Sequence, residues 1–139
     1  MRLLITTPTT IVVDAPDVAA VRAEDESGSF GILNGHADFL TALEVSVVDW
    51  RHADGRQRFC AVRRGVLSVA NGNEVAIATR EAVAGDDLAR LEHEVLAQFR
   101  DALEAERSAR TESLRLQMQA IRRILHYLRP ERPGFLGGA

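Results

Sequence analysis

Residues 65–79 read GVLSVANGNEVAIAT and place an Asn-Gly pair between two runs rich in Val and Ala. Such a pair is typical of a type I′ turn, because both central residues of that turn need positive φ. Short runs rich in β-branched residues and bounded by turn residues are typical of strands. We therefore predict a β-hairpin with its turn at Asn71 and Gly72.

The same pattern recurs outward from this hairpin through the first 84 residues. Asp54-Gly55 separates the runs VVDWRHA and RQRFCAV, which predicts a second hairpin. Several short strands at this spacing favour a sandwich or a barrel. The runs that indicate strands are LLIT, TIVV, DVAAVRAED, EVSVVDW, RFCAVR, GVLSVA and EVAIAT. We predict an antiparallel β-sandwich domain over residues 1–84.

The hydrophobic period changes at Gly85, where Asp86 and Asp87 supply a cap and a favourable charge for a helix N-terminus. A second helical stretch over residues 111–129 has apolar steps of four, three, four and three, typical of a coiled-coil seam. We predict a helical domain over residues 85–130 and a flexible tail over 131–139. The apolar residues of the two stretches are Leu88, Leu91, Val95, Phe99, Ala102 and Leu103, then Leu114, Met118, Ile121, Leu125 and Leu128.

The junction between the two helical stretches, RSART at residues 107–111, contains neither Gly nor Pro. The α+β fold can therefore end in a two-helix hairpin or in one long helix. Residues 81–106 hold eight acids and two Arg, a net charge of −6, whereas residues 107–132 hold seven Arg and two Glu, a net charge of +5. Folded back, an acidic helix meets a basic one; extended, the basic helix can dock on an acidic partner. The alternative is two solvated helix faces without a switch.

The composition excludes several classes of protein. The 139 residues are 46% hydrophobic and 27% charged, which is typical of a globular domain, and the net charge of −3 is too mild to indicate nucleic acid or membrane binding. We find no apolar run near the ~20 residues of a membrane span and no apolar signal-peptide core at the N-terminus. The single Cys60 excludes an internal disulfide and fits a reducing cytoplasm. All 17 basic residues are Arg, which excludes P-loop and Schiff-base lysines.

The four histidines do not suggest a catalytic or metal centre. The segment HEVLA starts at His93 like a zinc-protease helix, but Ala97 stands where the second ligand would be. His36 and Asp38 form a weak ligand pair without a third member, and one cysteine makes no thiolate cluster. We predict no catalytic, metal-binding or cofactor-binding residue and a chain that is not an enzyme.

Residues 28–43, GSFGILNGHADFLTAL, resemble the signature G-x-x-G-I-L-P-G-H-x-P-L-L-T-x-L of the epsilon subunit of F-type ATP synthases. Residues 63–88, RRGVLSVANGNEVAIATREAVAGDDL, are similar to the segment that leads into that family's C-terminal helices. The resemblance covers roughly residues 3–129. The Lys-free, Arg-rich second helical stretch is similar to that of the alternate, often sodium-linked branch of these enzymes.

The resemblance implies a non-catalytic rotor subunit of the central stalk. Such a subunit couples the gamma subunit to the membrane c-ring in ion-driven ATP synthesis or ATP-driven ion transport. It is a peripheral part of the complex at the cytoplasmic face of the inner membrane, needs no cofactor, meets the membrane only through the complex and binds no nucleic acid. Its C-terminal helix can extend toward the catalytic subunits and inhibit hydrolysis.

The resemblance also implies contact residues. Gly28, Ser29 and Phe30 would lie on the loop that faces the c-ring, and His36 would lie near the gamma subunit. The family often has an acidic residue where Ser29 stands, so either Glu26 supplies the charge here or the contact with the c-ring is weaker. The basic residues expected to dock on the catalytic subunits are Arg115, Arg122 and Arg123.

The departures from the family pattern have consequences. Asn34 and Asp38 replace prolines, although Asn34-Gly35 can still form the turn, because Asn tolerates positive φ. Some members of the family bind ATP through an I/L-D-x-x-R-A motif. In this chain Ala89 stands in place of the Asp of that motif and Glu92 in place of its Arg. We therefore predict no tight ATP binding. The basic segment also supports another class of protein, a free-standing adaptor whose basic helix binds an acidic protein or nucleic acid.

Overall fold

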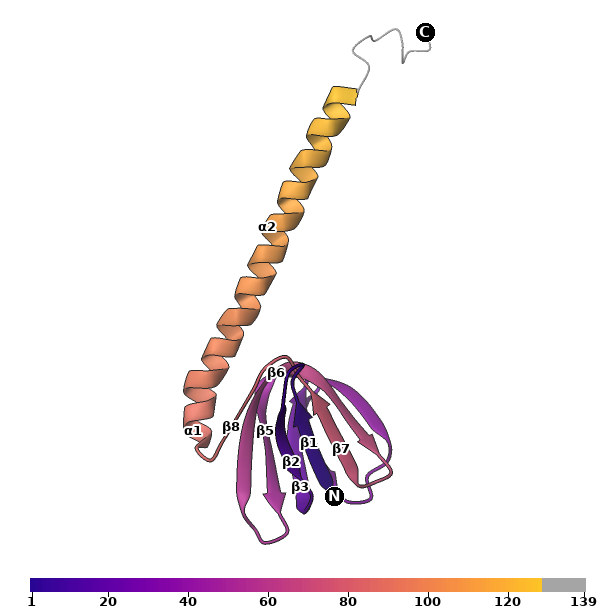
Figure 1. Ribbon diagram of the computed structural model, residues 1–139, viewed down its shortest axis with the longest axis vertical. Coiled ribbons are helices and arrows are strands. Elements are labelled where there is room, and N and C mark those ends of the chain that lie inside the picture. The colour runs from indigo at the N-terminus through magenta and orange to yellow at the C-terminus, as the bar shows by residue number, and fades with distance from the viewer. Residues whose placement is uncertain (129–139) are drawn as a thin grey trace. The chain divides into compact units, whose positions relative to one another are not determined.

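The computed structural model describes residues 1–128 as eight strands and one continuous helical segment (Figure 1). The sheet order is β2-β1-β7-β6-β5-β3-β4, and β8 also pairs with β6. The chain forms two compact units, which divide between Asp101 and Ala102. The strands are β1 (Arg2–Thr6), β2 (Ile11–Ala15), β3 (Val18–Asp25), β4 (Gly28–Leu33), β5 (Phe39–His52), β6 (Gln57–Ala70), β7 (Glu74–Ala78) and β8 (Ala82–Gly85), and the helical elements are α1 (Leu88–Arg90), the π-helical turn η1 (Leu91–Val95) and α2 (Leu96–Leu128).

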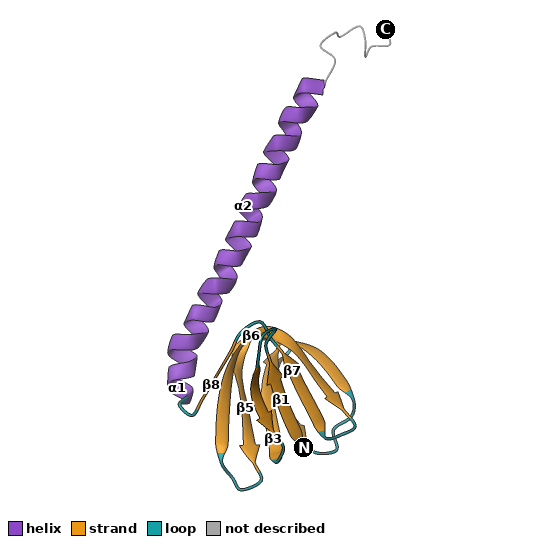
Figure 2. Ribbon diagram, viewed as in Figure 1, coloured by secondary structure: helices purple, strands orange, loops and turns teal. Residues whose placement is uncertain are grey.

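The strands form a β-sandwich of two layers because the long β5–β6 hairpin contributes to both (Figure 2). The first layer contains β2, β1, β7 and the paired segments 65–70 of β6 and 39–43 of β5. The second layer contains β4, β3, β8 and the paired segments 45–52 of β5 and 57–63 of β6. The predicted sandwich is confirmed, but it is not wholly antiparallel, because β1 pairs with β7 in parallel.

The hairpin crosses between the layers at Arg64 and Gly65. Gly65 has φ +142°, and a Cβ atom added there would lie 2.3 Å from the carbonyl oxygen of Ala78. Arg64 has φ 61°, which is unusual for a residue with a side chain. The sequence predicts two separate strands before and after this point, whereas the structure joins them in one bent strand, β6.

The core lies between the two layers and draws alternate residues from each strand. Leu3 and Ile5 of β1 and Val75 and Ile77 of β7 are almost completely buried. Burying a side chain of this size is worth roughly 1.5–3 kcal/mol. The second layer supplies Val18, Val21, Ile32, Val48, Trp50, Cys60 and Val62 to the same cluster.

Both predicted hairpins are confirmed, with different turns. Asn71 and Gly72 have φ of 57° and 71°, as a type I′ turn requires. At the β5–β6 turn only Gly55 has positive φ, and four residues separate the strands. The Asp54 carboxylate accepts from the Arg56 backbone N–H at 3.0 Å and from the Arg56 Nε at 2.8 Å. This Asx-type contact orders the longer turn.

The placement of Gly28, Ser29 and Phe30 on a loop is wrong. These residues begin strand β4, which pairs with β3. The pairing runs from Gly28 opposite Asp25 to Leu33 opposite Ala20. The cause is the tight turn at residues 26 and 27, since it lets the chain return directly along β3. Gly28 itself has φ +120° and completes that turn.

The first helical turns pack on the second layer. Of the predicted apolar face, Leu91, Val95 and Phe99 are buried, whereas Leu88 is 37% exposed. Leu96 is buried as well. In the π-helical turn the Leu96 N–H donates to the Leu91 carbonyl. Leu96 lies three residues before Phe99, on the same side of the helix. The contacted residues are Ala61, Val45, Val47, Phe59 and Val83. The predicted cap is confirmed, because the Asp87 carboxylate accepts from the Arg90 N–H at 3.3 Å.

Of the two predicted arrangements of the helical part, one long helix is the correct one. α2 runs through the junction at residues 107–111 without a break. The Thr111 hydroxyl donates to the Arg107 carbonyl at 2.9 Å, so it bonds inside the helix instead of capping a new one. The predicted seam is exposed, from 51% at Ile121 to 74% at Leu128. The predicted tail over 131–139 lies outside the described residues.

We predict that Gly65→Ala destabilises the fold by at least about 2 kcal/mol, because the methyl group meets the Ala78 backbone and the φ of +142° disfavours a side chain. Gly31→Ala is the matched control, since its Cβ atom would lie 3.8 Å from the Val21 carbonyl oxygen, in ordinary van der Waals contact. Urea unfolding curves of both variants measure the difference. Equal midpoints for the two variants would contradict the account of the bend.

Candidate docking surfaces

The turn between β3 and β4 carries Glu26, the predicted acidic contact residue. Glu26 is exposed, and the neighbouring Asp25 carboxylate is held by three donors. Asp25 Oδ1 accepts from the Ser27 N–H at 2.9 Å and from its hydroxyl at 2.5 Å, and Oδ2 accepts from the Thr41 hydroxyl at 2.7 Å. The hydrogen bonds from Ser27, then Thr41, lower the pKa of Asp25 below its usual value. The turn therefore presents a fixed, ionised acidic tip.

The other predicted residues of β4 have different surroundings. The Ser29 side chain is exposed, opposite Glu24 on β3. The Phe30 ring is half-buried against the core and meets the Phe39 ring edge-on, with 5.6 Å between centroids. Phe30 therefore positions the strand more than it presents a contact surface.

His36 lies at the opposite end of β4 from Glu26, in the loop before β5. Its Nδ1 atom lies 2.6 Å from the Ala37 carbonyl oxygen, and its ring centroid lies 5.7 Å from that of Phe39. The loop is tied to the β6–β7 turn, because the Gly35 N–H donates to the Gly72 carbonyl and the Asn71 N–H donates to the Asp38 carboxylate. This geometry gives His36 a fixed, partly exposed position. Among residues 1–128, no three His, Cys, Asp or Glu side chains gather to hold a metal ion.

Sequence reasoning missed the outer face of the first layer. The strand register aligns Ala42, Val66, Ala78 and Thr6 in one row, and Leu40, Ser68, Ala76 and Leu4 in the next. Val66 is 48% exposed and Leu40 is 71% exposed. Across β5, β6, β7 and β1 neither row carries a charge, whereas the β2 edge carries Asp14 opposite Leu4. Exposed apolar surfaces of this kind often mark interaction sites. We call it the apolar face: Leu4, Ile11, Leu40, Ala42, Val66, Ala76 and Ala78.

A signal for the apolar face is present in the sequence. In the strand EVAIA, Val75 and Ile77 point into the core, so Ala76 and Ala78 must point outward. Outward positions of an antiparallel strand with one solvated face are usually polar. Small apolar residues at such positions indicate that another surface covers them.

The three predicted docking arginines lie on α2. The Arg115 guanidinium bonds to Glu112 at 2.9 Å, three residues earlier on the helix. Arg122 and Arg123 are adjacent and exposed. An exposed ion pair such as Arg115–Glu112 is worth little, so Arg115 can exchange it for another acidic partner.

The segment compared with the ATP-binding motif is occupied by local contacts. The Asp87 carboxylate caps the helix, and the Arg90 Nε lies 3.5 Å from Glu94. Ala89 and Glu92 are exposed beside them. The absence of tight ATP binding stays a prediction.

Cys60 is fully buried, and burial raises the pKa of its thiol to about 12. The thiolate is the reactive form, so this cysteine is unreactive at neutral pH.

None of the helices within residues 1–128 is both long and apolar enough to cross a membrane.

The comparisons with known proteins fit this architecture. Residues 1–85 match the family described as ATP synthase, Delta/Epsilon chain, beta-sandwich domain. The chain is 50% identical over 132 residues to ATP synthase epsilon chain 2 of Paraburkholderia xenovorans, an alignment that covers 95% of each chain. It is 45% identical over 128 residues to ATP synthase epsilon chain 2 of Cereibacter sphaeroides, covering 92% of this chain and 88% of that one.

Solved structures share the fold. A chain of the Euglena gracilis mitochondrial ATP synthase matches with a TM-score of 0.58 and 24% identity, over 76% of this chain and 62% of that one. A chain of the Tetrahymena thermophila mitochondrial ATP synthase matches with a TM-score of 0.53 and 15% identity, over 74% of this chain and 90% of that one. The chain belongs to the epsilon-chain family of F-type ATP synthases, as the glycine-rich signature indicates.

We predict that Thr41→Val raises the pKa of Asp25 toward its usual value, because the ionised carboxylate loses one of its donors. The stability that this lowered pKa contributes is present above the unfolded-state pKa, near 4. It is lost as the pH falls through the lower folded-state pKa. The variant should therefore lose less stability on acidification than the unsubstituted chain.

An NMR titration of the Asp25 carboxyl carbon measures this pKa directly. Thr10→Val is the matched control, because the Thr10 hydroxyl bonds to the Ile11 carbonyl and not to a carboxylate. An unchanged Asp25 pKa in Thr41→Val would show that the hydroxyl does not hold the carboxylate.

Proposed function

We propose that this chain is a non-catalytic rotor subunit that couples the gamma subunit to the membrane c-ring of an F-type ATP synthase. The matches to epsilon chains over nearly the whole sequence carry the proposal. The related Euglena and Tetrahymena structures are described as including the c-ring and, for Tetrahymena, the central stalk. The complex then holds the chain at the cytoplasmic face of the inner membrane, as a peripheral component.

The two ends of β4 suggest how the coupling is divided. The acidic tip at Glu26 is fixed by the Asp25 hydrogen bonds and fits the polar loops of the c-ring. The His36 loop and the adjoining apolar face, which begins at Leu40, fit the gamma subunit. A rotor coupling must transmit torque, and hydrogen-bonded strands joining two docking surfaces are stiff enough to do so.

The family membership favours the rotor subunit over the free-standing adaptor. Residues 107–128 nevertheless carry five Arg against one Glu, a charge that an acidic partner would neutralise. We propose that Arg115, Arg122 and Arg123 dock on acidic surfaces of the catalytic subunits and slow ATP hydrolysis. Such a brake needs a second arrangement of the helix of similar free energy, since only then can a partner shift the population.

The coupling proposal is tested by purifying the tagged chain from detergent-solubilised membranes and identifying the co-purified subunits by mass. Val66→Glu, at the centre of the apolar face, should lose most of the gamma subunit and c-ring, because an unpaired carboxylate would be buried in the interface. Ala89→Glu, an exposed site on α1, is the control and should retain them. Full recovery with Val66→Glu would contradict the assignment of the apolar face, and recovery of nucleic acid alone would favour the adaptor.

The brake is tested by truncation after Asp101, which keeps the helical turns that pack on the sandwich. The assembled complex should hydrolyse ATP faster than with the full chain and lose the salt dependence of its inhibition, because the basic helix is gone. Replacing Arg115, Arg122 and Arg123 together by Gln should give the same direction of change. Replacing Arg100, Arg107 and Arg110 by Gln removes the same charge and is the control. Unchanged rates of ATP hydrolysis both after truncation and after replacement of Arg115, Arg122 and Arg123 would contradict the brake.

A further inference from the structure

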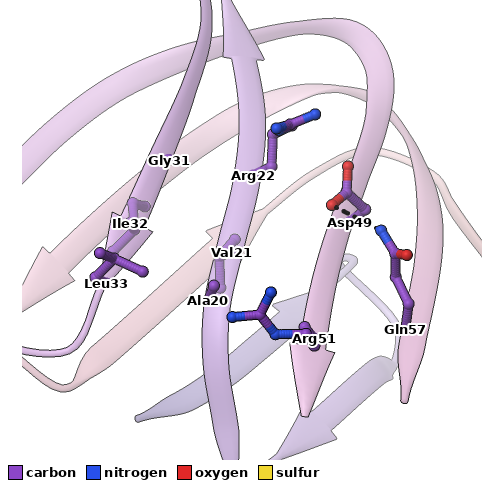
Figure 3. Close-up of a pocket in the computed structure, with 9 residues that line it drawn as sticks. All are labelled: Ala20, Val21, Arg22, Gly31, Ile32, Leu33, Asp49, Arg51 and Gln57. Carbon is purple, nitrogen blue, oxygen red and sulfur yellow. Dashed lines mark hydrogen bonds between the residues drawn. The ribbon is translucent and has the colours of Figure 1, made fainter. Parts of the chain in front are cut away.

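The outer face of the second layer carries a groove beside the edge strand β4 (Figure 3). Its volume of about 260 Å³ lies below the roughly 300–1,000 Å³ of small-molecule sites. The groove therefore fits a single side chain better than a cofactor-sized molecule. It is lined by Ala20, Val21, Arg22, Gly31, Ile32, Leu33, Asp49, Arg51 and Gln57.

Two arginines of this groove lack an ion pair. Among the described residues neither Arg22 nor Arg51 has a carboxylate within salt-bridge distance. The register places Asp49 beside Arg22, but the Asp49 carboxylate accepts only a long 3.5 Å bond from the Gln57 amide. Figure 3 shows the Arg51 side chain reaching from β5 toward Ala20 on β3. Two arginines and one aspartate give the groove a net charge of +1, which favours an anion.

Gly31 keeps the groove open toward the sheet edge. Its φ is not positive, and an added Cβ atom would have only the Val21 carbonyl oxygen nearby, at 3.8 Å. The fold of this chain therefore does not require glycine there, in contrast to Gly65. Glycine inside a strand costs about 0.5–1 kcal/mol relative to alanine. The space above Gly31 is open to a side chain from another chain, and a single methyl group there would leave most of it open.

The β4 edge is unprotected. β4 pairs only with β3, so half of its backbone groups face outward. Edge strands are usually blunted by charged residues or proline. The sequence of β4, GSFGIL, contains neither, and Leu33 is 62% exposed. Such an edge can accept an added strand from another chain.

We propose that an extended acidic segment of a neighbouring subunit adds to the β4 edge and places a carboxylate over Gly31, between Arg22 and Arg51. Strands lie about 4.8 Å apart, so a carboxylate side chain of the added strand spans the bare glycine and meets the guanidinium groups. Charge-assisted hydrogen bonds then hold the segment. Glu24, opposite Ser29, makes a second carboxylate unfavourable at the next outward position. The proposal rests on the proposed function, which supplies the neighbouring subunits.

The absence of lysine from the chain offers a direct test. Arg51→Lys creates a single side-chain amine, which a carbodiimide couples only to a carboxylate in contact with it. The tagged variant is purified in its complex from membranes, treated with carbodiimide, and searched by mass spectrometry for cross-linked peptides containing position 51. We expect a cross-link to an Asp or Glu of another subunit.

The matched variants separate the outcomes. Arg64→Lys places an exposed amine at the bend and should not link to the same carboxylate. Adding Gly31→Glu to Arg51→Lys should abolish the cross-link, because the new carboxylate occupies the groove, whereas adding Gly31→Ala should preserve it. Coupling only within this chain, or none, would overturn the proposal. Failure to co-purify with the complex would instead contradict the proposed function, so the two failures are distinguishable.

Discussion

The close approach of Gly65 to the Ala78 backbone is the constraint on which the sandwich depends. Only a residue without a side chain fits there, and it allows β6 to leave one layer and enter the other. The same two strands therefore hold both layers in register. Because the layers share β5 and β6, the core cannot open without breaking the longest ladder of the sheet.

Sharing strands also fixes what each outer face can do. On the second layer, Val45, Val47, Phe59 and Val83 are covered by the first helical turns, and Leu96 adds to that contact. On the first layer, the apolar face has no such cover among the described residues. The chain thus covers one apolar face internally and leaves the other exposed among the described residues. This asymmetry is the structural reason for assigning the gamma contact to the first layer.

The sequence predicts what local chemistry determines. The Asn71-Gly72 turn, the Asp87 cap and the buried helix residues Leu91, Val95 and Phe99 follow from short-range signals, and the structure confirms them. Residues 107–111 contain neither Gly nor Pro, so the sequence is compatible with both a helical hairpin and one long helix. The choice between them depends on long-range contacts. The sites themselves were harder to predict: the family resemblance singled out β4, but placed its first residues on a loop.

What sequence reasoning missed depends on register between distant strands. Val66, Ala78 and Ala42 form one surface only because three strands align them, and no local pattern shows that alignment. The groove at Arg22 and Arg51 also arises from pairing across β3, β4 and β5. Leu96 lies at the edge of the helix face that the sequence predicts, eight residues after Leu88, and only its packing on the sheet shows that it is buried.

If the first layer meets the gamma subunit, the apolar face is covered in the assembled complex and open in the free chain. Ala78→Cys places a thiol at its centre, and the buried, high-pKa Cys60 gives little background reaction. The measurement is the rate of maleimide labelling of this variant, free and in the purified complex, with Ala89→Cys as a reference site. The account predicts rapid labelling of Ala78→Cys in the free chain and strong protection in the complex, whereas Ala89→Cys labels in both. Equal labelling of Ala78→Cys in the two states would contradict it.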